Sequence, residues 1–281
     1  GLGLSGESVI NFFKNNGIKN FKVWDDNKKN LHKKYRSKNL FHTLNQVNYI
    51  VLSPGISLVK NKKLRKFKKK IITDIDLFYL YHSKFKSIVV TGTNGKSTTC
   101  KLLAHLLQKN KFKCSLGGNI GMPILNLKNF KNGFVIIEAS SFQLSHSKFI
   151  CPNYALLLNF SNDHLDWHGS KKKYLNSKLK IFNLQKEKNY AIISQNLKKK
   201  FIKNKFSGKL LFPKIKNYRK IKDKIKNDYL TSNINEENMS FVYTLSKLLK
   251  ISEKSFFRAM KSFKGLSHRF EIFLKRGNIT F

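Results

Sequence analysis

Residues 87–98 read SIVVTGTNGKST, an apolar stretch that runs directly into a loop with two glycines, a lysine and several hydroxyl residues. The apolar stretch predicts a buried strand, and the residues from Lys96 to Gln108 predict a helix. A glycine loop in this context turns backbone N–H groups onto phosphate oxygens, beside the positive end of the helix dipole. Lys96 can reach the β- and γ-phosphates, and a loop hydroxyl can ligate Mg²⁺. The spacing is shorter than GxxxxGK[ST], so a chance glycine turn is the alternative to the predicted ATP site at Gly92, Thr93, Asn94, Gly95, Lys96, Ser97 and Thr98.

The chain around this loop alternates short apolar strands with helices, which predicts an α/β fold with a parallel sheet covered by helices. We assign residues 83–266 to a central domain that contains the loop. Its other predicted elements are strands at 134–137, 155–158 and 190–193 and a helix at 235–250. The lysine- and asparagine-rich stretches 198–205 and 214–227 are expected to be surface helices or loops.

Residues 1–82 are predicted to form a first α/β domain. It opens on a glycine-rich turn, and its predicted elements are a helix ending at Gly17, strands at 21–24, 49–52 and 71–72, and a helical segment at 74–78. No strand precedes the first turn, although a dinucleotide-binding βαβ unit has one there. Residues 267–281, with a predicted strand at 270–274 and a turn at 277–278, are too few for a domain. We therefore expect a chain truncated at both ends.

The composition indicates a globular protein. The chain has 281 residues, of which 41% are hydrophobic and 13% aromatic, enough for two apolar cores. No apolar run approaches the roughly 20 residues needed to cross a bilayer, and the first residues do not resemble a signal peptide. The three cysteines lack CxxC spacing, so neither a disulfide framework nor a zinc site is predicted. These features favour a cytoplasmic protein without a membrane partner.

The net charge of +41 has two interpretations. It can mark a surface that binds nucleic acid or another polyanion. It can also reflect compositional drift towards lysine, asparagine, isoleucine and phenylalanine, whose codons are rich in A and T. Only 6 of the 56 basic residues are arginine, whose bidentate fork suits phosphate recognition, and the lysines are spread along the whole chain. We favour drift, predict no nucleic-acid partner and expect the run 60–70 to be a solvated face.

Polar residues also follow two other predicted strands, at the edge where open α/β sheets bind ligands. Glu138 ends the strand 134–137 and can hold Mg²⁺ beside the loop hydroxyl, with a strand-end salt bridge as the alternative. The segment 162–166 follows the strand 155–158, which favours a metal or substrate role for His164 over a surface histidine. Lys178 lies on the next predicted helix and is not distinguished from its neighbours by composition.

These residues, taken in chain order, resemble the Mur ligases. The features in common are the loop Thr91–Thr98, Glu138 and the triplet Asn162–His164. Mur ligases are ATP-dependent amino-acid ligases that build the peptide of the bacterial cell wall. The strings EASSFQL from Glu138, SPGI from Ser53, GGNIG from Gly117 and GLSHRFE from Gly265 are similar to the branch that adds D-glutamate to UDP-N-acetylmuramoyl-L-alanine.

This resemblance covers the chain from Gly1 to Phe281 and implies three domains. Residues 1–82 correspond to an N-terminal Rossmann-like UDP-binding domain, and residues 83–266 to a central P-loop ATPase-type α/β domain. The C-terminal Rossmann-like domain is almost entirely missing, since residues 267–281 are only its start. Most of the D-glutamate site belongs to that domain. We therefore expect the chain to bind ATP but not to complete ligation by itself.

The resemblance also implies a mechanism. ATP phosphorylates the substrate carboxylate, and the amine of D-glutamate attacks the resulting acyl phosphate, so no protein nucleophile is required. The implied catalytic residues are Lys96 at the β- and γ-phosphates, Glu138 with Ser97 at one Mg²⁺, and His164 with a carbamylated Lys178 at a second Mg²⁺. Carbamylation turns the ammonium group into an anionic oxygen ligand, which suits this ion.

Further binding residues follow from the same resemblance. Asn238 matches an adenine contact and Arg269 a phosphate contact. Asp26 and Asn27 depart from the family's pattern for uracil recognition. The positions implied for the UDP-sugar are Leu4, Ser5, Asp25, Gly55, Asn119, Ser140 and His164.

The function expected from the resemblance is that of a cytoplasmic, monomeric ligase of peptidoglycan synthesis with ATP and Mg²⁺. Two alternatives remain at this point. One is another Mur-type ligase with a different amino acid, against which the string Ser140–Gln143 argues. The other is a non-catalytic nucleotide-binding protein.

Overall fold

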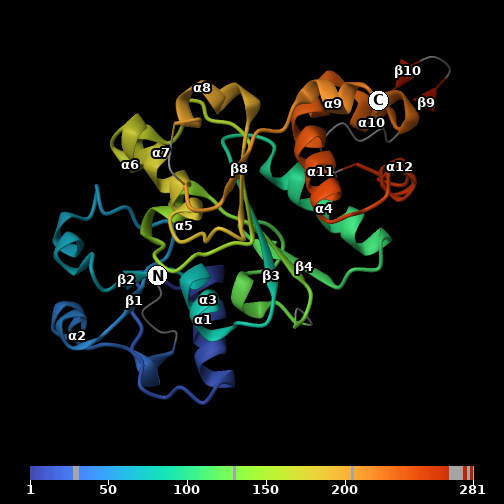
Figure 1. Cartoon of the computed structure of the whole chain (residues 1–281). Coiled ribbons are helices and arrows are strands. Elements are labelled where there is room, and N and C mark those ends of the chain that lie inside the picture. Colours follow the sequence, from blue (N-terminus) through green and yellow to red (C-terminus); the bar gives the residue numbers. More distant parts are fainter. Residues whose placement is uncertain (28–31, 129–130, 204–205, 266–274, 277–278, 281) are drawn as a thin grey trace.

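The computed structural model describes residues 1–27, 32–128, 131–203, 206–265, 275–276 and 279–280 (Figure 1). At its centre is a six-stranded, fully parallel sheet with the strand order β4-β5-β3-β6-β7-β8. Its strands are β3 (Lys86–Thr91), β4 (Cys114–Gly118), β5 (Phe134–Glu138), β6 (Tyr154–Leu157), β7 (Tyr190–Ile193) and β8 (Lys209–Leu211). The predicted α/β class with a parallel sheet is therefore confirmed.

Helices cover both faces of this sheet. In β3, Ile88 and Val90 belong to one apolar core and Val89 to the other, and all three are fully buried. The first core includes α4 (Lys96–Lys109), α11 (Glu236–Leu248) and α12 (Glu253–Lys261), which lie together in Figure 1. The second includes α3 (Asp74–Tyr81), α5 (Ser141–His146) and α7 (Lys171–Leu179). Burial on both sides explains why the central strands are continuous apolar runs.

The two edge strands, β4 and β8, were not predicted. β4 has the sequence CSLGG, with two glycines, and only Gly117 within it is buried. β8 has only three residues, none of them buried. An edge strand has one neighbour and packs less completely, so its sequence need not carry the apolar run that identifies a central strand.

Five of the remaining helices are short, and one of them, α9 (Ile215–Arg219), lies in a lysine-rich part of the chain. The lysine-rich stretch 214–227, expected at the surface, contributes to the first core, because Tyr218 and Ile225 are fully buried and α9 contacts α11. The lysines around these apolar positions conceal their helical spacing. The short helices are α2 (Leu40–Gln46), α6 (Leu165–His168), α8 (Lys198–Phe201), α9 (Ile215–Arg219) and α10 (Asp228–Thr231).

The N-terminal part combines α1 (Leu4–Asn15) with a two-stranded parallel sheet of β1 (Ile50–Val51) and β2 (Ile71–Ile72). Gly17 follows α1 with a left-handed φ of 69°, which confirms its predicted role at the helix C-terminus. The strand predicted at 21–24 is wrong. Only Val23 pairs there, in an isolated bridge to Arg36, so no ladder extends to its neighbours.

Helix α3 connects this part to the central sheet. Thr73 caps it with a reciprocal hydrogen bond to Asp76, and its apolar residues Ile75 and Phe78 pack into the second core. The buried Asp76 carboxylate also accepts hydrogen bonds from the Ser147 hydroxyl at 2.7 Å and the Phe149 N–H at 2.7 Å. Packing and hydrogen bonds therefore hold α3 against the loop that follows α5.

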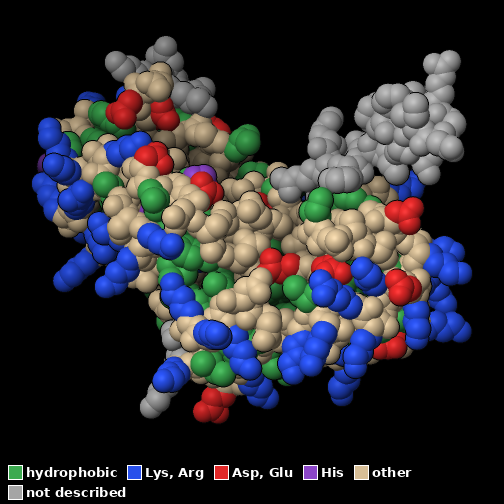
Figure 2. Space-filling model, turned by 90° about the horizontal axis from the view of Figure 1, so that it is seen from above, with side chains coloured by type: hydrophobic (Ala, Val, Ile, Leu, Met, Phe, Trp, Pro, Cys, Tyr) green, Lys and Arg blue, Asp and Glu red, His purple; other side chains and the backbone are tan. Residues whose placement is uncertain are grey.

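The basic side chains lie mainly outside these cores. In the run 60–70, the lysines are exposed except for the partly buried Lys70, whereas Phe67 is buried. Figure 2 shows Lys and Arg side chains spread along the margins of one face rather than gathered in one place. No helix in the described ranges is both long enough and apolar enough to cross a membrane.

Near the C-terminus, β9 (Lys275–Arg276) and β10 (Ile279–Thr280) form an antiparallel pair. The strand predicted at 270–274, the turn at 277–278 and the phosphate contact predicted for Arg269 lie outside the described residues.

Candidate nucleotide and substrate site

The predicted phosphate loop connects β3 to α4 at the carboxyl edge of the sheet. Gly95 has a left-handed φ of 78°, and α4 begins at Lys96. Thr73 and Ser140 cap α3 and α5 with their side chains, whereas no described side chain caps α4. The N–H groups of its first turn have no partner within the helix either. This helix N-terminus can therefore donate to an anion.

Gly95 also permits a close approach to α11. A Cβ atom on Gly95 would lie 2.2 Å from Asn238 Oδ1, the atom that accepts a hydrogen bond from the Thr99 hydroxyl at 3.3 Å. The structure thus places Asn238, the predicted adenine contact, directly against the phosphate loop.

We expect Gly95→Ala to weaken ATP binding by about tenfold or more, because it combines a steric clash with backbone strain of about 1–3 kcal/mol. The affinity can be measured by titration with a non-hydrolysable ATP analogue. Gly17→Ala is the matched control, since its φ is also left-handed but no atom of the described residues lies within 4 Å of an added Cβ. Equal affinities in both variants and the wild type would contradict this role for Gly95.

Two lysines converge on the carbonyl of Gly92. Lys96 Nζ donates to the carbonyls of Gly92 at 3.0 Å and Thr93 at 2.8 Å, and Lys178 Nζ donates to Gly92 at 2.7 Å. Lys178 is buried and lies over the Tyr174 ring, 4.6 Å from its centroid. Its burial, and then the charge of Lys96, lower the pKa of Lys178 to about 7. The positive charge of Lys96 thus lies beside the Lys178 amine, which loses its proton at a lower pH than an ordinary lysine does.

Glu138 is buried at the end of β5, where it pairs with Val90 two residues before the loop. Its Oε1 accepts a hydrogen bond from Asn119 Nδ2 at 3.2 Å, whereas its Oε2 is buried without a hydrogen-bond partner among the described residues. Burial raises the pKa of the Cys100 thiol in α4, and the nearby Glu138 charge raises it further. Glu138 therefore lies close to the first turns of α4.

This carboxylate fits a Mg²⁺ ion. A buried carboxylate oxygen without a partner is costly, and a bound cation satisfies it. Within the described ranges, no three His, Cys, Asp or Glu side chains come together as a metal site. Mg²⁺ is commonly held by one or two carboxylates together with phosphate and water.

His164 precedes α6 in a left-handed conformation, with φ at 50°. Its Nε2 lies 3.3 Å from Asp163 Oδ2, and its ring centroid lies 4.6 Å from that of Phe142 and 6.2 Å from that of Tyr174. The Asp163 charge raises the pKa of Lys178 and so opposes the effect of burial, which lowers it. The structure thus places His164, Asp163 and Lys178 around Tyr174.

The other two central residues predicted for the UDP-sugar have partners already. Asn119 binds Glu138 through its side chain and through its backbone N–H, which donates to the Glu138 carbonyl at 2.8 Å. The Ser140 hydroxyl caps α5 by accepting from the Gln143 N–H at 3.2 Å and contacts Gln143 Oε1 at 3.1 Å. The UDP-sugar contacts assigned to both residues stay predictions.

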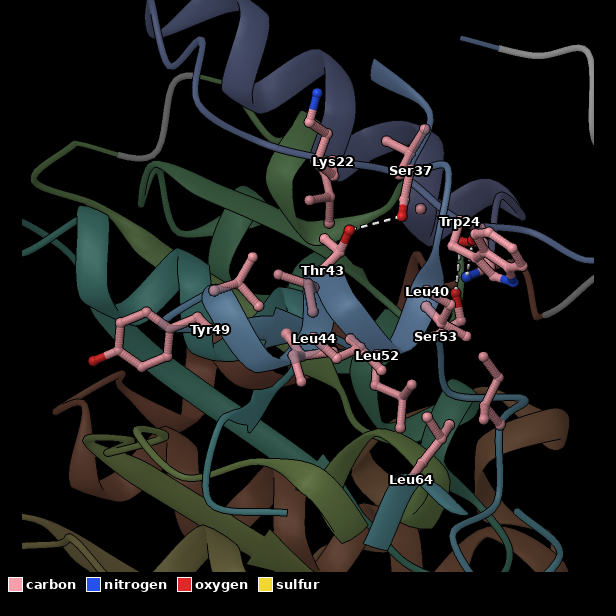
Figure 3. A pocket seen from close by; sticks show the side chains of 18 of the residues that line it. Lys22, Trp24, Ser37, Leu40, Thr43, Leu44, Tyr49, Leu52, Ser53 and Leu64 are labelled. Carbon is pink, nitrogen blue, oxygen red and sulfur yellow. Dashed lines mark hydrogen bonds between the residues drawn. The ribbon is translucent and has the colours of Figure 1, made fainter. Parts of the chain in front are cut away.

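A cavity of about 1210 Å³ opens in the N-terminal part, between α1, α2 and β1 (Figure 3). Ser5 and Gly55, two of the residues predicted to bind the UDP-sugar, line it. Leu4 is 83% exposed and, like Asp25, is not among the lining residues. Asp25 Oδ2 instead accepts the N–H of Leu2 at 2.6 Å and so holds the first turn in place.

This cavity is connected to the central part through the segment after Gly55. The Ser57 hydroxyl donates to the Trp167 carbonyl at 2.7 Å, and the Ile56 carbonyl lies 3.3 Å from His146 Nε2. Trp167 belongs to α6, directly after His164. Ser57 follows the lining residue Ile56, so this contact links the edge of the cavity to α6, the helix that follows His164.

Sequence reasoning did not identify Asn159, which contacts the loop, or Glu237, which contacts Asn159. Asn159 hydrogen-bonds to Thr93 and Asn94, and Glu237 hydrogen-bonds to Asn159. The available signal was the place of Asn159 directly after an apolar strand, at the ligand-binding edge.

Comparison with known proteins agrees with this geometry. Residues 90–258 match the family described as Mur ligase middle domain. UDP-N-acetylmuramoylalanine–D-glutamate ligase of Rickettsia prowazekii is 33% identical over 312 residues, which cover 100% of this chain and 69% of that protein. The protein of the same name from Pseudothermotoga lettingae is 34% identical, with 83% of this chain and 55% of that protein covered.

Solved structures show the same fold at low sequence identity. The MurF ligase of Thermotoga maritima, crystallised with ADP, matches with a TM-score of 0.54 and 18% identity over 74% of this chain and 57% of that one. UDP-N-acetylmuramate-alanine ligase of the same organism matches with a TM-score of 0.54 and 19% identity over 98% of this chain and 70% of that one. With the family match over residues 90–258 and the identity to curated relatives along the whole chain, these findings show that the chain belongs to the Mur ligase family.

Proposed function

We propose that this chain carries the ATP and UDP-sugar sites of a ligase that joins D-glutamate to UDP-N-acetylmuramoyl-L-alanine in peptidoglycan synthesis. The observation that carries the proposal is the phosphate loop beside Glu138, a buried carboxylate with one oxygen free of hydrogen-bond partners among the described residues. The names of the curated relatives support the choice of D-glutamate.

The proposed chemistry needs charge neutralisation more than a reactive side chain. Transfer of the γ-phosphate activates the alanine carboxylate as an acyl phosphate, which the amine of D-glutamate then attacks. Lys96 and the N-terminus of α4 neutralise the phosphate oxygens, and Glu138 with Ser97 would hold Mg²⁺, which would supply further positive charge there. Asn119 orients the Glu138 carboxylate through the 3.2 Å hydrogen bond.

On the other side of the loop, we assign His164 and Lys178 to a second Mg²⁺ and propose that Lys178 is carbamylated. The support is the burial of its amine, its hydrogen bond to the loop and the nearby Asp163 and His164. A carbamate supplies the oxygen atoms that this ion prefers, whereas an ammonium group supplies none.

The UDP half of the substrate is assigned to the N-terminal cavity, where Ser5 and Gly55 line the wall. Residues 1–82 then form the UDP-sugar domain and residues 83–266 the ATP domain. The hydrogen bond from Ser57 to α6 brings the two domains together near His164, where the sugar and its peptide must reach the γ-phosphate.

The proposal is tested by phosphate release from ATP in the presence of UDP-N-acetylmuramoyl-L-alanine, measured on the intact natural protein. We expect release to depend on both the UDP-sugar and an amino acid, with D-glutamate far more effective than L-lysine, diaminopimelate or L-alanine. Stimulation by one of the other amino acids would assign the protein to a different Mur ligase reaction. Absence of nucleotide binding would refute the proposal altogether.

A further inference from the structure

Asn159 lies two residues beyond the end of β6, and its side chain hydrogen-bonds to both N–H and C=O groups of the phosphate-loop backbone. Its Oδ1 accepts the backbone N–H groups of Thr93 at 3.0 Å and Asn94 at 2.8 Å, and its Nδ2 donates to the Asn94 carbonyl at 3.2 Å. The backbone carbonyl of Asn159 also accepts a hydrogen bond from the Thr93 N–H at 3.3 Å. One amide group thus mimics the pairing of a neighbouring strand and fixes the conformation of the loop before Gly95.

The same amide also reaches α11. Asn159 Nδ2 lies 3.4 Å from Glu237 Oε2, and Glu237 Oε1 accepts a hydrogen bond of 2.6 Å from Ser194 at the end of β7. The next residue on α11 is Asn238, which lies against Gly95 at the other end of the loop. Helix α11 therefore touches the loop at two points, directly through Asn238 and indirectly through Glu237 and Asn159.

These contacts leave some N–H groups of the loop bonded to Asn159 and others available to bind phosphate. Those of Thr93 and Asn94 are already bonded to Asn159, so the N–H groups that remain for phosphate are those at the start of α4. A glycine-containing loop without such a support would have to be ordered when the nucleotide binds, at a cost in conformational entropy.

We propose that Asn159 is a positioning residue that holds the phosphate loop in a fixed relation to α11, and so couples binding of the adenine end of ATP to binding of its phosphates. The inference rests on the proposed function, since it takes the loop as the ATP site. Asn159 acts through the loop and α11 and does not itself touch the nucleotide.

The substitution Asn159→Asp tests this role with little change in shape. The aspartate retains an oxygen for the Thr93 and Asn94 N–H groups, but it loses the Nδ2 donor and places a second carboxylate opposite Glu237. We expect the Kd for Mg·ADP to rise by about tenfold, the effect of losing a charge-assisted hydrogen bond. Glu237→Gln alone is expected to raise it by about threefold, because a neutral acceptor replaces a charged one.

The double variant Asn159→Asp/Glu237→Gln reverses the donor and the acceptor of the hydrogen bond between these two residues, since the glutamine amide can donate to the aspartate, but it does not restore the donor to the Asn94 carbonyl. We expect its Kd to recover to within about threefold of the wild type. Asn153→Asp is the matched control. Asn153 precedes the other end of β6, and its Oδ1 accepts the Ser87 N–H at 2.8 Å, but it is remote from the loop. Its Kd for Mg·ADP should stay unchanged.

Unchanged Mg·ADP affinity in Asn159→Asp, or no recovery in the double variant, would overturn the inference. If Asn159 had a merely structural role, Asn159→Asp would lower both the affinity for the UDP-sugar and the melting temperature by at least as much as Asn153→Asp does. Neither quantity would then recover in the double variant, and this result would also overturn the inference. Wild-type protein that fails to bind Mg·ADP would overturn the proposed function and this inference together. Normal wild-type binding with insensitive variants overturns the inference alone.

Discussion

Glu138→Gln is expected to lower the rate of ligation by about a thousandfold. The change replaces one carboxylate oxygen by an NH₂ group of similar size, so packing at the end of β5 is retained while the charge is lost. Oε2, which has no hydrogen-bond partner among the described residues, is the atom available to Mg²⁺. A metal ligand of this kind contributes several kcal/mol to stabilising the developing charge, and each tenfold in rate corresponds to roughly 1.4 kcal/mol.

The stability of the metal-free protein should respond in the opposite direction. Glu138 is buried, and one oxygen has no compensating hydrogen bond among the described residues, so removing the charge relieves a desolvation cost. We expect the melting temperature without nucleotide to be maintained or raised. The increase produced by Mg·ADP in the wild type should be largely lost, because ligand-induced stabilisation follows affinity. Thermal unfolding with and without Mg·ADP measures both effects.

Glu236→Gln is the matched control, a second buried glutamate with the contrary arrangement. Arg219 lies 2.7 Å from one of its oxygens and Lys222 lies 3.1 Å from the other, and the hydrogen bond from Arg219 is the main cause of its lowered pKa. Glutamine at 236 should therefore lower the melting temperature and leave turnover near that of the wild type. If Glu138→Gln destabilised the metal-free protein and retained activity, Glu138 would be a structural residue and the metal assignment would be wrong.

The contrast between Glu138 and Glu236 shows which features of a buried carboxylate can be predicted from the sequence and which cannot. The strand before Glu138 is apolar on both faces, so its end and its place at the ligand-binding edge were predictable. The choice between a metal ligand and a salt bridge was not. It depends on which groups surround the carboxylate, and Asn119, 19 residues earlier, is brought to it only by the pairing of β4 with β5.

The contacts around the phosphate loop were hidden for the same reason. The motif Gly92–Thr98 and the helix after it are local patterns, and sequence alone identifies them. Asn159 meets Asn94 across 65 residues and Lys178 meets Gly92 across 86. Such long-range contacts depend on strand order and helix packing, so the periodicity of apolar residues in the sequence does not predict them. Lys178 is one of four lysines of α7, and only its burial distinguishes it from the other three.

Lys178→Met is expected to reduce ligation by about a thousandfold, because it removes the proposed ligand of the second Mg²⁺ while its side chain can still fill the buried space. The structure places this amine against the Gly92 carbonyl and beside the Tyr174 ring, shielded from solvent. Only a neutral amine attacks CO₂. An N–C bond then forms, a proton leaves to the solvent, and the carbamate carries a negative charge.

The lowered pKa of Lys178 determines how carbamate formation depends on pH. With a pKa of about 7 in place of 10.5, the folded protein holds a largely neutral amine above pH 7. Carbamate formation and activity should therefore rise as the pH increases through about 7 at constant dissolved CO₂. Between these pKa values the unfolded chain binds more protons at this group than the folded chain does. Its contribution to the free energy of unfolding therefore rises with pH across this interval, by at most about 1.4 kcal/mol per pH unit.

Isotopically labelled bicarbonate followed by NMR measures the carbamate directly. We expect a carbamate signal from the wild type at mildly alkaline pH, its loss on acidification below about pH 6, and no such signal from Lys178→Met. Lys180→Met is the matched control and should retain the signal. Lys180 is also partly buried, with its pKa lowered to about 8, but its Nζ donates to the Ser145 and Ser147 carbonyls, and Asp76 favours its charged form. A signal that persists in Lys178→Met, or activity of that variant equal to the wild type, would show that the second metal site does not depend on this lysine.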